Sequence, residues 1–483
     1  MDRPPEPGVT RPVPPTGPLV HRIPVALPAE ILAQRIGSWA GPALLEGGPG
    51  LGDPGRWSIL AARPRRVFES PDGRGFRWSG AGLDLEAEGD ALEGLAAIAA
   101  RYRLADPAEA PGPSLPPFQG GLIGHLGYDL APRLERLPRR ASPDSRIPAV
   151  RFGLYDTFVQ VDHRTGSAEL WAVDLLDEGP ESLTKRRDAW LADLQSPAPP
   201  TAKPSLSPPR ADRSRDDYLR SVRRILGYIE AGDIYQANLS QRFVARGRPE
   251  PLELRRRLRA ISPAPYAAFL AWDDLAVVGA SPELFYRTEG DRIVTRPIKG
   301  TRPRSSDPAE DARLAEELAA SPKDRAELTM IVDLERNDLG RFCRFGSVRV
   351  AEPRASETFE QVHHLVATIE GQLRPGVGPI EVIRSVFPGG SITGAPKIRA
   401  MEIIDEQEPH RRSLYTGAVG YLGRSGVSAF NIAIRTILVE GDRVSYQVGG
   451  GIVADSDPER EYAETLDKAR GMRQALDDSG GGR

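Results

Sequence analysis

The chain has 483 residues and a mass of 52.5 kDa, enough for roughly two to four domains. Hydrophobic residues make up 40% and charged residues 27%, which excludes a wholly disordered chain. The net charge is −3, which is unlike the basic surface of a nucleic-acid-binding protein. No apolar run approaches the ~20 residues of a membrane helix, and the N-terminus has no apolar segment of the kind found in secretory signals. We therefore expect a cytoplasmic protein that binds neither nucleic acid nor membrane.

The first part of the chain alternates short strand-like runs with turns. Seven prolines fall in residues 1–20, so we expect a disordered, proline-rich arm there. Within residues 21–195, strand-like runs such as 57–60 and 158–161 are separated by Gly and Pro. Residues 117–124 are glycine-rich but lie between strand-like segments, which favours close packing of a strand over a phosphate-binding loop.

A linker and an α+β region are predicted next. Six prolines in residues 196–212 indicate the linker. Residues 216–231 have the apolar spacing of an amphipathic helix, and Gly232 suits its end. Residues 213–476 alternate strands and helices without a regular βαβ rhythm, so we predict an α+β fold with large antiparallel sheets rather than a doubly wound parallel sheet. The polar tail 477–483 is expected to be flexible.

A carboxylate stands near the start of one predicted helix. Ser321 is the expected N-cap, and Pro322 occupies the first turn. Glu327 follows one turn later, beside the apolar face that Leu328 and Ile331 begin. It can be a solvated side chain favoured by the helix dipole, or part of a site.

A second helix with carboxylates is predicted to open at Ser456, which has capping-box spacing to Glu459. Glu461 and Glu464 are i, i+3 neighbours on one face. Three consecutive glycines precede this helix, where backbone N–H groups can approach an anion: Gly449, Gly450 and Gly451. Carboxylates next to an anion would repel it unless a divalent cation lay between them, and oxygen ligands suit Mg²⁺.

Two basic side chains occupy unusual contexts. The chain has 58 arginines and only 6 lysines, so a remaining lysine can mark a site that needs a deprotonatable amine. Lys299 precedes Gly300 and is a candidate nucleophile, with an ordinary ion pair as the alternative. Arg435 lies in the apolar, strand-like run 430–436, so its guanidinium needs a carboxylate partner from the protein or from a ligand.

Two further segments bear on the chemistry. Residues 388–397 form a glycine-rich loop that runs into a helix from about Pro396, but they lack Walker spacing, which favours carboxylate binding or a simple turn over phosphate binding. Cys343 is the only cysteine and lacks an elbow-like glycine context, so we expect a structural thiol. If the protein uses glutamine nitrogen, another chain must therefore release it.

The order of these segments resembles that of the chorismate-utilising enzymes. The matching motifs are PIKGT at 297–301, SPKDRAELTMIVDLERNDLGR at 321–341, GSITGAPK at 390–397, and residues 449–464 followed by Lys468. The likeness covers about residues 218–476, and the region 21–195 resembles the anthranilate-synthase-like part of the family more loosely, through 117–121 and 127–130. The resemblance implies an α/β sandwich around two large antiparallel sheets, with the N-terminal region interleaved.

The resemblance also implies roles for individual residues. Glu327 and Glu464 would bind Mg²⁺, which would hold the ring carboxylate of chorismate. Glu283 would be the general acid that helps to expel the hydroxyl. The expected substrate-binding residues are the backbone donors Gly449, Gly450 and Gly451, the enolpyruvyl-carboxylate ligands Tyr415 and Arg435, the ring-lining Gly300, Thr301, His364 and Ser391, and Lys468.

Lys299 determines which reaction the resemblance implies. Anthranilate synthases read PIAGT at the matching motif, and there ammonia attacks C2 of the ring directly. A lysine implies instead that its amine attacks C2 as the C4 hydroxyl leaves, after which ammonia adds at C4 and expels the lysine. The product would be 4-amino-4-deoxychorismate. Gln236 stands where isochorismate and salicylate synthases place a water-activating lysine, which argues against water as the nucleophile.

The resemblance implies chorismate as the substrate and a separate glutamine amidotransferase subunit, in a heterodimer, as the source of ammonia. Anthranilate formation, or a non-catalytic role in activating a glutaminase, are the alternatives. One motif departs from the family: relatives often read LLES, where the serine helps to bind tryptophan, but residues 44–47 read LLEG. With Gly47 in place of that serine, the motif no longer predicts tryptophan binding.

Overall fold

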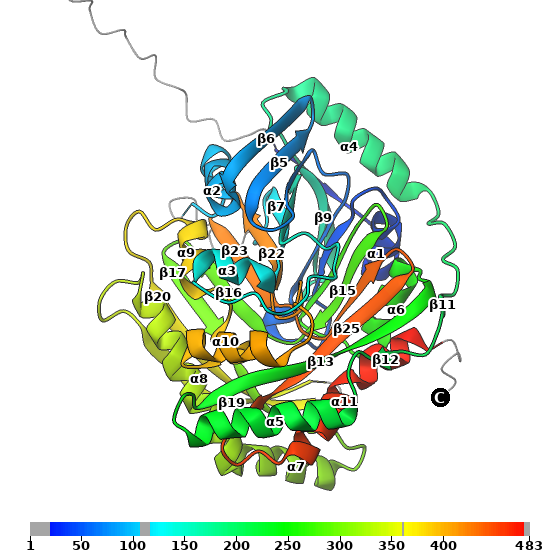
Figure 1. Ribbon diagram of the computed structural model, residues 1–483. Coiled ribbons are helices and arrows are strands. Elements are labelled where there is room, and N and C mark those ends of the chain that lie inside the picture. Colours follow the sequence, from blue (N-terminus) through cyan, green and yellow to red (C-terminus); the bar gives the residue numbers. More distant parts are fainter. Residues whose placement is uncertain (1–19, 107–115, 360–361, 478–483) are drawn as a thin grey trace, which may run out of the picture.

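The computed structural model describes residues 20–106, 116–359 and 362–477. The predicted arm and tail lie outside the described residues, except for Val20 and Asp477. Two large antiparallel sheets lie at the centre of the molecule, with helices around them (Figure 1). The predicted α+β class and the expected pair of sheets are confirmed.

The first sheet has 13 strands, and its central path runs through strands from both halves of the chain. In spatial order these are β1 (Val20–Pro24), β10 (Ser167–Val173), β9 (Thr157–Asp162), β3 (Trp57–Ala61), β2 (Ala43–Glu46), β14 (Tyr266–Trp272), β15 (Leu275–Ser281), β24 (Thr436–Glu440), β25 (Arg443–Ile452), β13 (Gln236–Arg248) and β11 (Ser205–Leu206). Two short strands, β12 (Arg210–Ala211) and β21 (Gly394–Ala395), also pair with β13. The proline-rich segment 196–212 therefore contributes two short strands to the edge of this sheet.

The second sheet has 12 strands and also mixes the two halves of the chain. Its order is β18 (Ile298–Pro303), β20 (Val362–Gln372), β17 (Arg292–Arg296), β16 (Leu284–Glu289), β23 (Val427–Ile432), β22 (Ala418–Gly423), β7 (Gly121–Leu126), β8 (Val150–Tyr155), β4 (Arg66–Ser70), β5 (Arg74–Gly80) and β6 (Leu83–Asp90), with β19 (Arg349–Thr358) on β20. Because β14 pairs with β2 and β22 pairs with β7, the N-terminal region is interleaved with the rest.

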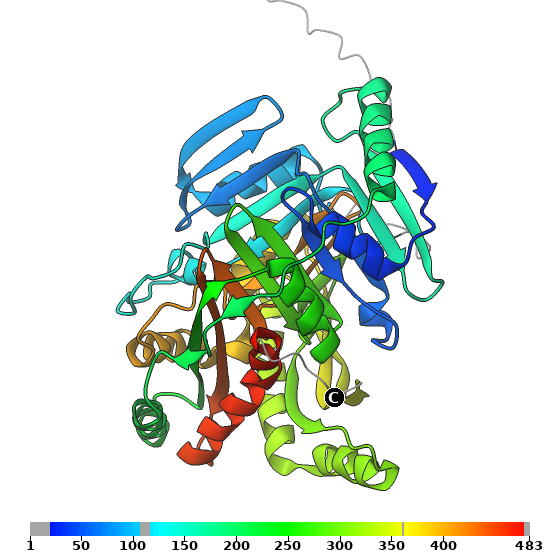
Figure 2. The ribbon, with the colours of Figure 1, turned by 90° about the vertical axis from the view of Figure 1, so that its right-hand side faces the viewer.

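Helices cover the outer faces and the lower end of the sheets (Figures 1 and 2). They are α1 (Ala29–Gly37), α2 (Ala91–Arg101), α3 (Ala131–Leu134), α4 (Pro180–Gln195), α5 (Arg215–Glu230), α6 (Pro251–Ile261), α7 (Pro308–Ala320), α8 (Pro322–Gly340), α9 (Pro379–Val386), α10 (Lys397–Gln407) and α11 (Pro458–Leu476). Helix α7 projects from the lower end in Figure 2. Within the described residues, no helix is long and apolar enough to span a membrane.

The main hydrophobic core lies between the two sheets. Phe158 on β9 and Phe152 on β8 both belong to this buried cluster, although they come from different sheets. A second cluster packs α1, α6 and α11 on the first sheet, through residues such as Ile36, Leu254 and Met472. Burying one large apolar side chain such as Leu, Ile, Met or Phe stabilises the fold by about 1.5–3 kcal/mol relative to leaving that side chain exposed to water.

The glycine-rich segment 117–124 is a closely packed strand, as predicted. Gly124 lies in β7, where a Cβ atom would stand only 1.9 Å from the carbonyl oxygen of Arg151 on β8. The strand-like runs at 57–60 and 158–161 lie in β3 and β9. A side chain at position 124 would force β7 and β8 apart, so glycine here serves sheet packing rather than anion binding.

Helix starts were predicted correctly in three places and wrongly in one. Helix α10 begins at Lys397, next to the predicted start at about Pro396. Ser321 caps α8 by accepting a hydrogen bond from the backbone N–H of Asp324, and α5 spans the predicted helix at 216–231. The N-cap of α11 is Asp457, however, and not Ser456. The Ser456 hydroxyl instead donates to the Glu461 carboxylate at 2.6 Å, so this serine belongs to the acidic face of the helix.

Candidate active site

Lys299 lies where several charged groups meet. Strand β18 carries it, and its Nζ donates a hydrogen bond to the Ser391 carbonyl at 3.2 Å. Burial lowers the pKa of Lys299 and Lys468 adds to this effect, while Glu327, Glu283 and Glu464 oppose it. A lower pKa increases the fraction of neutral amine, the form that can attack a carbon atom.

Glu283 is a buried carboxyl group beside this amine. It is 5% exposed and lies in the short connection between β15 and β16. Burial raises its pKa, although the Ser391 hydroxyl, Lys299 and Arg435 favour the charged form. The Ser391 hydroxyl is buried and has no hydrogen-bond partner at normal distance in the described part of the chain. It can therefore pair either with the Glu283 carboxyl group or with a bound ligand.

Carboxylates from α8 and α11 face each other across the site. Burial raises the pKa of Glu327, and Lys299 and Lys323 oppose this. The Nζ of Lys323 lies 3.9 Å from carboxylate oxygens of both Glu327 and Glu461, which links the two helices. On α11, Glu464 pairs with Lys468 at 2.6 Å. The two predicted metal ligands, Glu327 and Glu464, thus face one site with Glu461, which the sequence placed on the same helix face as Glu464 but not among the ligands.

The three consecutive glycines lie near the end of strand β25. A Cβ atom at Gly450 would lie 3.1 Å from a Glu461 oxygen and 3.5 Å from a Glu464 oxygen, so the backbone itself faces these carboxylates. Lys468 donates to the Gly449 carbonyl at 2.8 Å. The fully buried carboxamide of Gln236 adjoins Gly451, and neither of its polar atoms has a partner among the described residues.

Arg435 was predicted to lie within a strand, and this is wrong. It lies in the connection between β23 and β24 with φ of 52°, because the chain turns there from one sheet to the other. Among the described residues, Tyr415, Glu464 and Glu283 act on this guanidinium only through their charge, without a hydrogen bond to it, so it can accept an anionic ligand. Burial lowers its pKa, while Tyr415, Glu464 and Glu283 oppose this. An arginine that is partly buried without a carboxylate suits an anionic ligand.

Gly300, Thr301 and His364 form one side of the site. Thr301 on β18 pairs with His364 on β20, and their side chains are hydrogen-bonded at 3.0 Å. Burial, with Arg435 nearby, lowers the pKa of His364 to about 4, so the ring is neutral at pH 7. Gly300 has φ of 78°, and a Cβ atom there would lie 2.8 Å from Leu318 and 2.9 Å from Asp324, so only glycine fits this turn.

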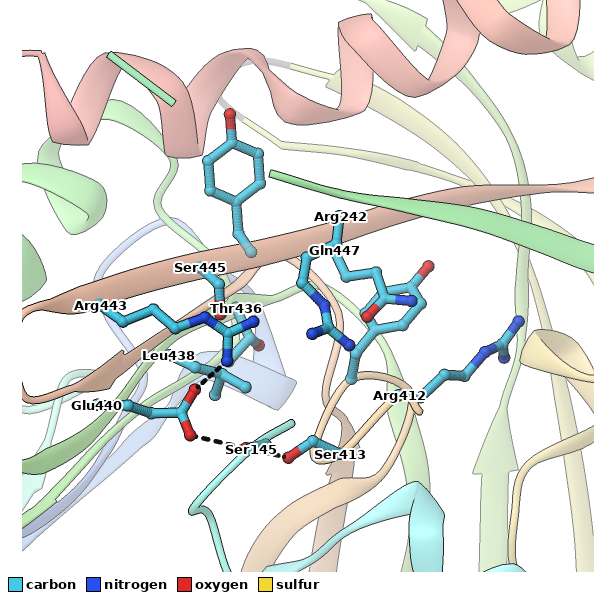
Figure 3. Close-up of a pocket in the computed structure, with 12 residues that line it drawn as sticks. Ser145, Arg242, Arg412, Ser413, Thr436, Leu438, Glu440, Arg443, Ser445 and Gln447 are labelled. Atoms are coloured by element: carbon cyan, nitrogen blue, oxygen red, sulfur yellow. Dashed lines mark hydrogen bonds and ion pairs between the residues drawn. The ribbon is translucent and has the colours of Figure 1, made fainter. Parts of the chain in front are cut away.

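Arg412 and Glu408 form a buried ion pair next to the site, and no sequence motif identified this pair. Arg412 donates to Glu408 at 2.8 Å, to the Ile392 carbonyl at 3.0 Å and to the Asn238 carbonyl at 2.7 Å. Figure 3 shows Arg412 at the edge of a small pocket. Tyr415 is another of the residues that line this pocket. Arg412 therefore ties the loop before Thr393 to strand β13.

Backbone atoms pack closely around Gly47, the position at which the sequence departs from the LLES motif. A Cβ atom at Gly47 would lie 2.0 Å from the Gly55 carbonyl oxygen and 2.8 Å from that of Trp57. Arg259 also donates to the Gly47 carbonyl at 2.5 Å. We predict that Gly47→Ser does not create tryptophan binding but destabilises the fold by about 3 kcal/mol, since overpacking at backbone atoms is expensive.

Thermal unfolding with and without tryptophan tests this prediction. Gly227→Ser is the matched control, because Gly227 is exposed on α5 and nothing lies within 4 Å of the position of its Cβ. A Gly47→Ser variant as stable as the control, or stabilised by tryptophan, would contradict the prediction.

Together, both sheets and helices α8 and α11 contribute to a site with a partly buried amine, a partly buried guanidinium and a buried carboxyl group, as in an enzyme that binds a small anionic substrate. A family model described as chorismate binding enzyme matches residues 58–474. The chain therefore belongs to the chorismate-binding enzyme family.

Individual relatives carry two different names. The chain is 41% identical to anthranilate synthase component 1 of Thermus thermophilus over 87% of this chain and 89% of the relative. It is 45% identical to aminodeoxychorismate synthase component 1 of Klebsiella aerogenes over 76% and 79%. Among solved structures, anthranilate synthase component I of Streptococcus pneumoniae superposes with a TM-score of 0.76 at 32% identity, over 86% of this chain and 92% of that one.

The predicted metal site has few side-chain ligands in the described part of the chain. No group of three or more His, Cys, Asp or Glu side chains there is arranged to hold a metal ion. The carboxylates of Glu327 and Glu464 nevertheless provide oxygen-only donors whose charged neighbours are mainly lysines. A divalent cation at this position would need further oxygen ligands from substrate or water.

Proposed function

We propose that this chain is the chorismate-aminating component of an aminodeoxychorismate synthase, which makes 4-amino-4-deoxychorismate from chorismate and ammonia for p-aminobenzoate and folate synthesis. The observation that supports this most is the enclosed amine of Lys299, with its lowered pKa, beside the carboxyl of Glu283. A neutral amine is a nucleophile, and a carboxyl whose pKa is raised is a general acid. The reaction transfers an amino group to the ring.

The anionic substrate would be held from two sides. Arg435 has no hydrogen-bonded carboxylate among the described groups that shift its pKa, and with Tyr415 it would bind the enolpyruvyl carboxylate. Gly449, Gly450 and Gly451 would bind the ring carboxylate, assisted by Lys468. Gly300, Thr301, His364 and Ser391 would line the ring.

Mg²⁺ is the proposed cofactor, with Glu327 and Glu464 as its protein ligands. The donor set fits a hard cation, because it consists of carboxylate oxygens from two helices and a glycine backbone that leaves room for substrate. When bound, the ion would supply positive charge that neutralises the ring carboxylate of chorismate. Glu461 lies beside these ligands and would help to position them.

In the first chemical step, Lys299 Nζ bonds to C2 of the ring, both ring double bonds shift by one position, and the C4–O bond breaks. Glu283 gives its proton to the departing hydroxyl, which leaves as water, and the new secondary ammonium returns a proton to Glu283. In the second step, ammonia bonds to C4, both double bonds shift back, and the C2–N bond breaks. The proton that the added nitrogen loses goes to Lys299, which leaves as a neutral amine.

Ammonia would come from a separate glutamine amidotransferase subunit. Cys343 is the only cysteine, and it is 3% exposed. Burial raises the pKa of its thiol to about 11, so the thiolate needed for glutamine hydrolysis is scarce. A heterodimer with such a partner, in the cytoplasm, is the expected working form.

Anthranilate formation is the second candidate, because relatives with both names align at similar identity, 41% and 45%. The purified chain with chorismate, Mg²⁺ and an ammonium salt should make 4-amino-4-deoxychorismate, identified by chromatography and mass spectrometry. Anthranilate and pyruvate as main products would overturn the proposal in favour of the second candidate. Calorimetry that detects neither chorismate nor Mg²⁺ binding would indicate a non-catalytic subunit.

A further inference from the structure

Glu335 is an enclosed carboxyl group two turns beyond Glu327 on α8, and the proposed mechanism does not use it. Its Oε2 lies 2.7 Å from the hydroxyl of Thr295 on β17. The same hydroxyl lies 2.7 Å from the Phe285 carbonyl oxygen on β16. A threonine hydroxyl has one proton to donate, and a carbonyl oxygen can only accept. If Thr295 donates to Phe285, the contact with Glu335 is a hydrogen bond only when the carboxyl carries the proton and donates it.

The charges around Glu335 agree with a neutral carboxyl. Glu283 and Asp338 both oppose its ionisation. Lys397 favours the charged form, but this lysine already pairs with Asp338 at 2.5 Å and donates to the Val386 carbonyl. Glu335 is half-buried, and this burial raises its pKa to about 8 despite the Thr295 hydrogen bond.

The position of Phe285 explains what this contact can do. Phe285 comes two residues after Glu283, at an irregularity in the sheet. The pairing of β16 with β17 shifts register between Leu284 and Arg287, and its pairing with β23 shifts between Leu284 and Tyr286. Bulges of this kind re-aim side chains near active sites and leave backbone groups outside the ladder. At this irregularity, the Thr295 hydroxyl donates a hydrogen bond to the Phe285 carbonyl oxygen.

We propose that Glu335 is a positioning residue for Glu283: as a neutral acid it donates to Thr295, which donates to the Phe285 carbonyl and so holds the bulge that aims the Glu283 carboxyl. The inference rests on the proposed function only for the role of Glu283 as general acid. When Glu335 ionises, Thr295 faces two acceptors with a single proton, and the bulge loses its support.

The test compares Glu335→Gln with Glu335→Ala. The amide of Gln can donate to Thr295 at every pH, so Glu335→Gln should keep kcat within about twofold at pH 7 and keep it further into the alkaline range than the wild type. Glu335→Ala should lower kcat by about tenfold to a hundredfold, since a misplacement of about 1 Å can cost about a hundredfold. The Kd of chorismate should stay within about twofold in both variants, because its carboxylates are bound elsewhere.

Substitutions of Thr295 provide a second measurement if Glu335→Ala does not fold. Thr295→Ser keeps the hydroxyl and should keep kcat, whereas Thr295→Val should lower kcat like Glu335→Ala. The inference would be overturned if the wild type, Glu335→Gln and Glu335→Ala had equal kcat and identical pH profiles. It would also be overturned if chorismate binding weakened in parallel with kcat. Chorismate consumption is the readout, so the outcome does not depend on which product forms, and product identity tests the proposed function separately.

Discussion

Lys299→Ala is expected to lower kcat for amination of chorismate by at least about a thousandfold, with little change in KM. The variant loses the nucleophile of the first step, while the groups proposed to bind both carboxylates remain. An interaction made only during the reaction affects kcat rather than ground-state binding. Initial rates at saturating chorismate and ammonium, with product identification, measure this effect.

Two controls make the Lys299 result specific. Lys299→Arg should be as inactive as Lys299→Ala, because a guanidinium stays protonated and cannot act as the nucleophile. Lys203→Ala, at an exposed position of the segment 196–212, should keep full activity. The wild type quenched during turnover should carry a chorismate-derived mass on Lys299. Unchanged turnover by Lys299→Ala would remove the lysine from the mechanism.

The sequence could predict the parts of the site that local pattern determines. The caps and apolar periodicity of α5 and α8 are short-range features, and both helices form where these features place them. The close packing of β7 could also be predicted from the sequence, because several glycines within a strand-like run have few other roles. Motif order located Lys299, Glu327 and Glu464, and the fold brings them to one site.

The remaining features depend on long-range contacts that no local pattern encodes. Arg435 follows an apolar run that looks like one strand, but the chain leaves the second sheet there and enters the first. Asp457 and Ser456 are both good N-cap residues, and the position of Glu461 decides which of them caps α11. Arg412 is one of 58 arginines, so nothing local distinguishes a buried structural arginine from an exposed one.

Arg412→Met should destabilise the fold by about 3–5 kcal/mol, the usual loss when one partner of a buried ion pair is removed. The side chains of Arg412 and Glu408 are 1% and 3% exposed. The Glu408 carboxylate also accepts from the backbone N–H and hydroxyl of Ser240, at 2.9 and 2.6 Å, so it would stay buried with too few positive neighbours. Chemical denaturation of the purified protein measures the free energy of unfolding.

The exposed pair between Arg146 and Asp274 is the matched control for this substitution. Its atoms lie 2.7 Å apart, as close as in the buried pair, but both side chains are 55% exposed. Arg146→Met should therefore change the free energy of unfolding by no more than about 1 kcal/mol. Because Arg412 also holds the Ile392 carbonyl, next to Ser391, its loss should raise the KM for chorismate as well. Equal stability losses in the two variants would mean that burial adds nothing to the Arg412 pair, and that the loop before Thr393 is held by other contacts.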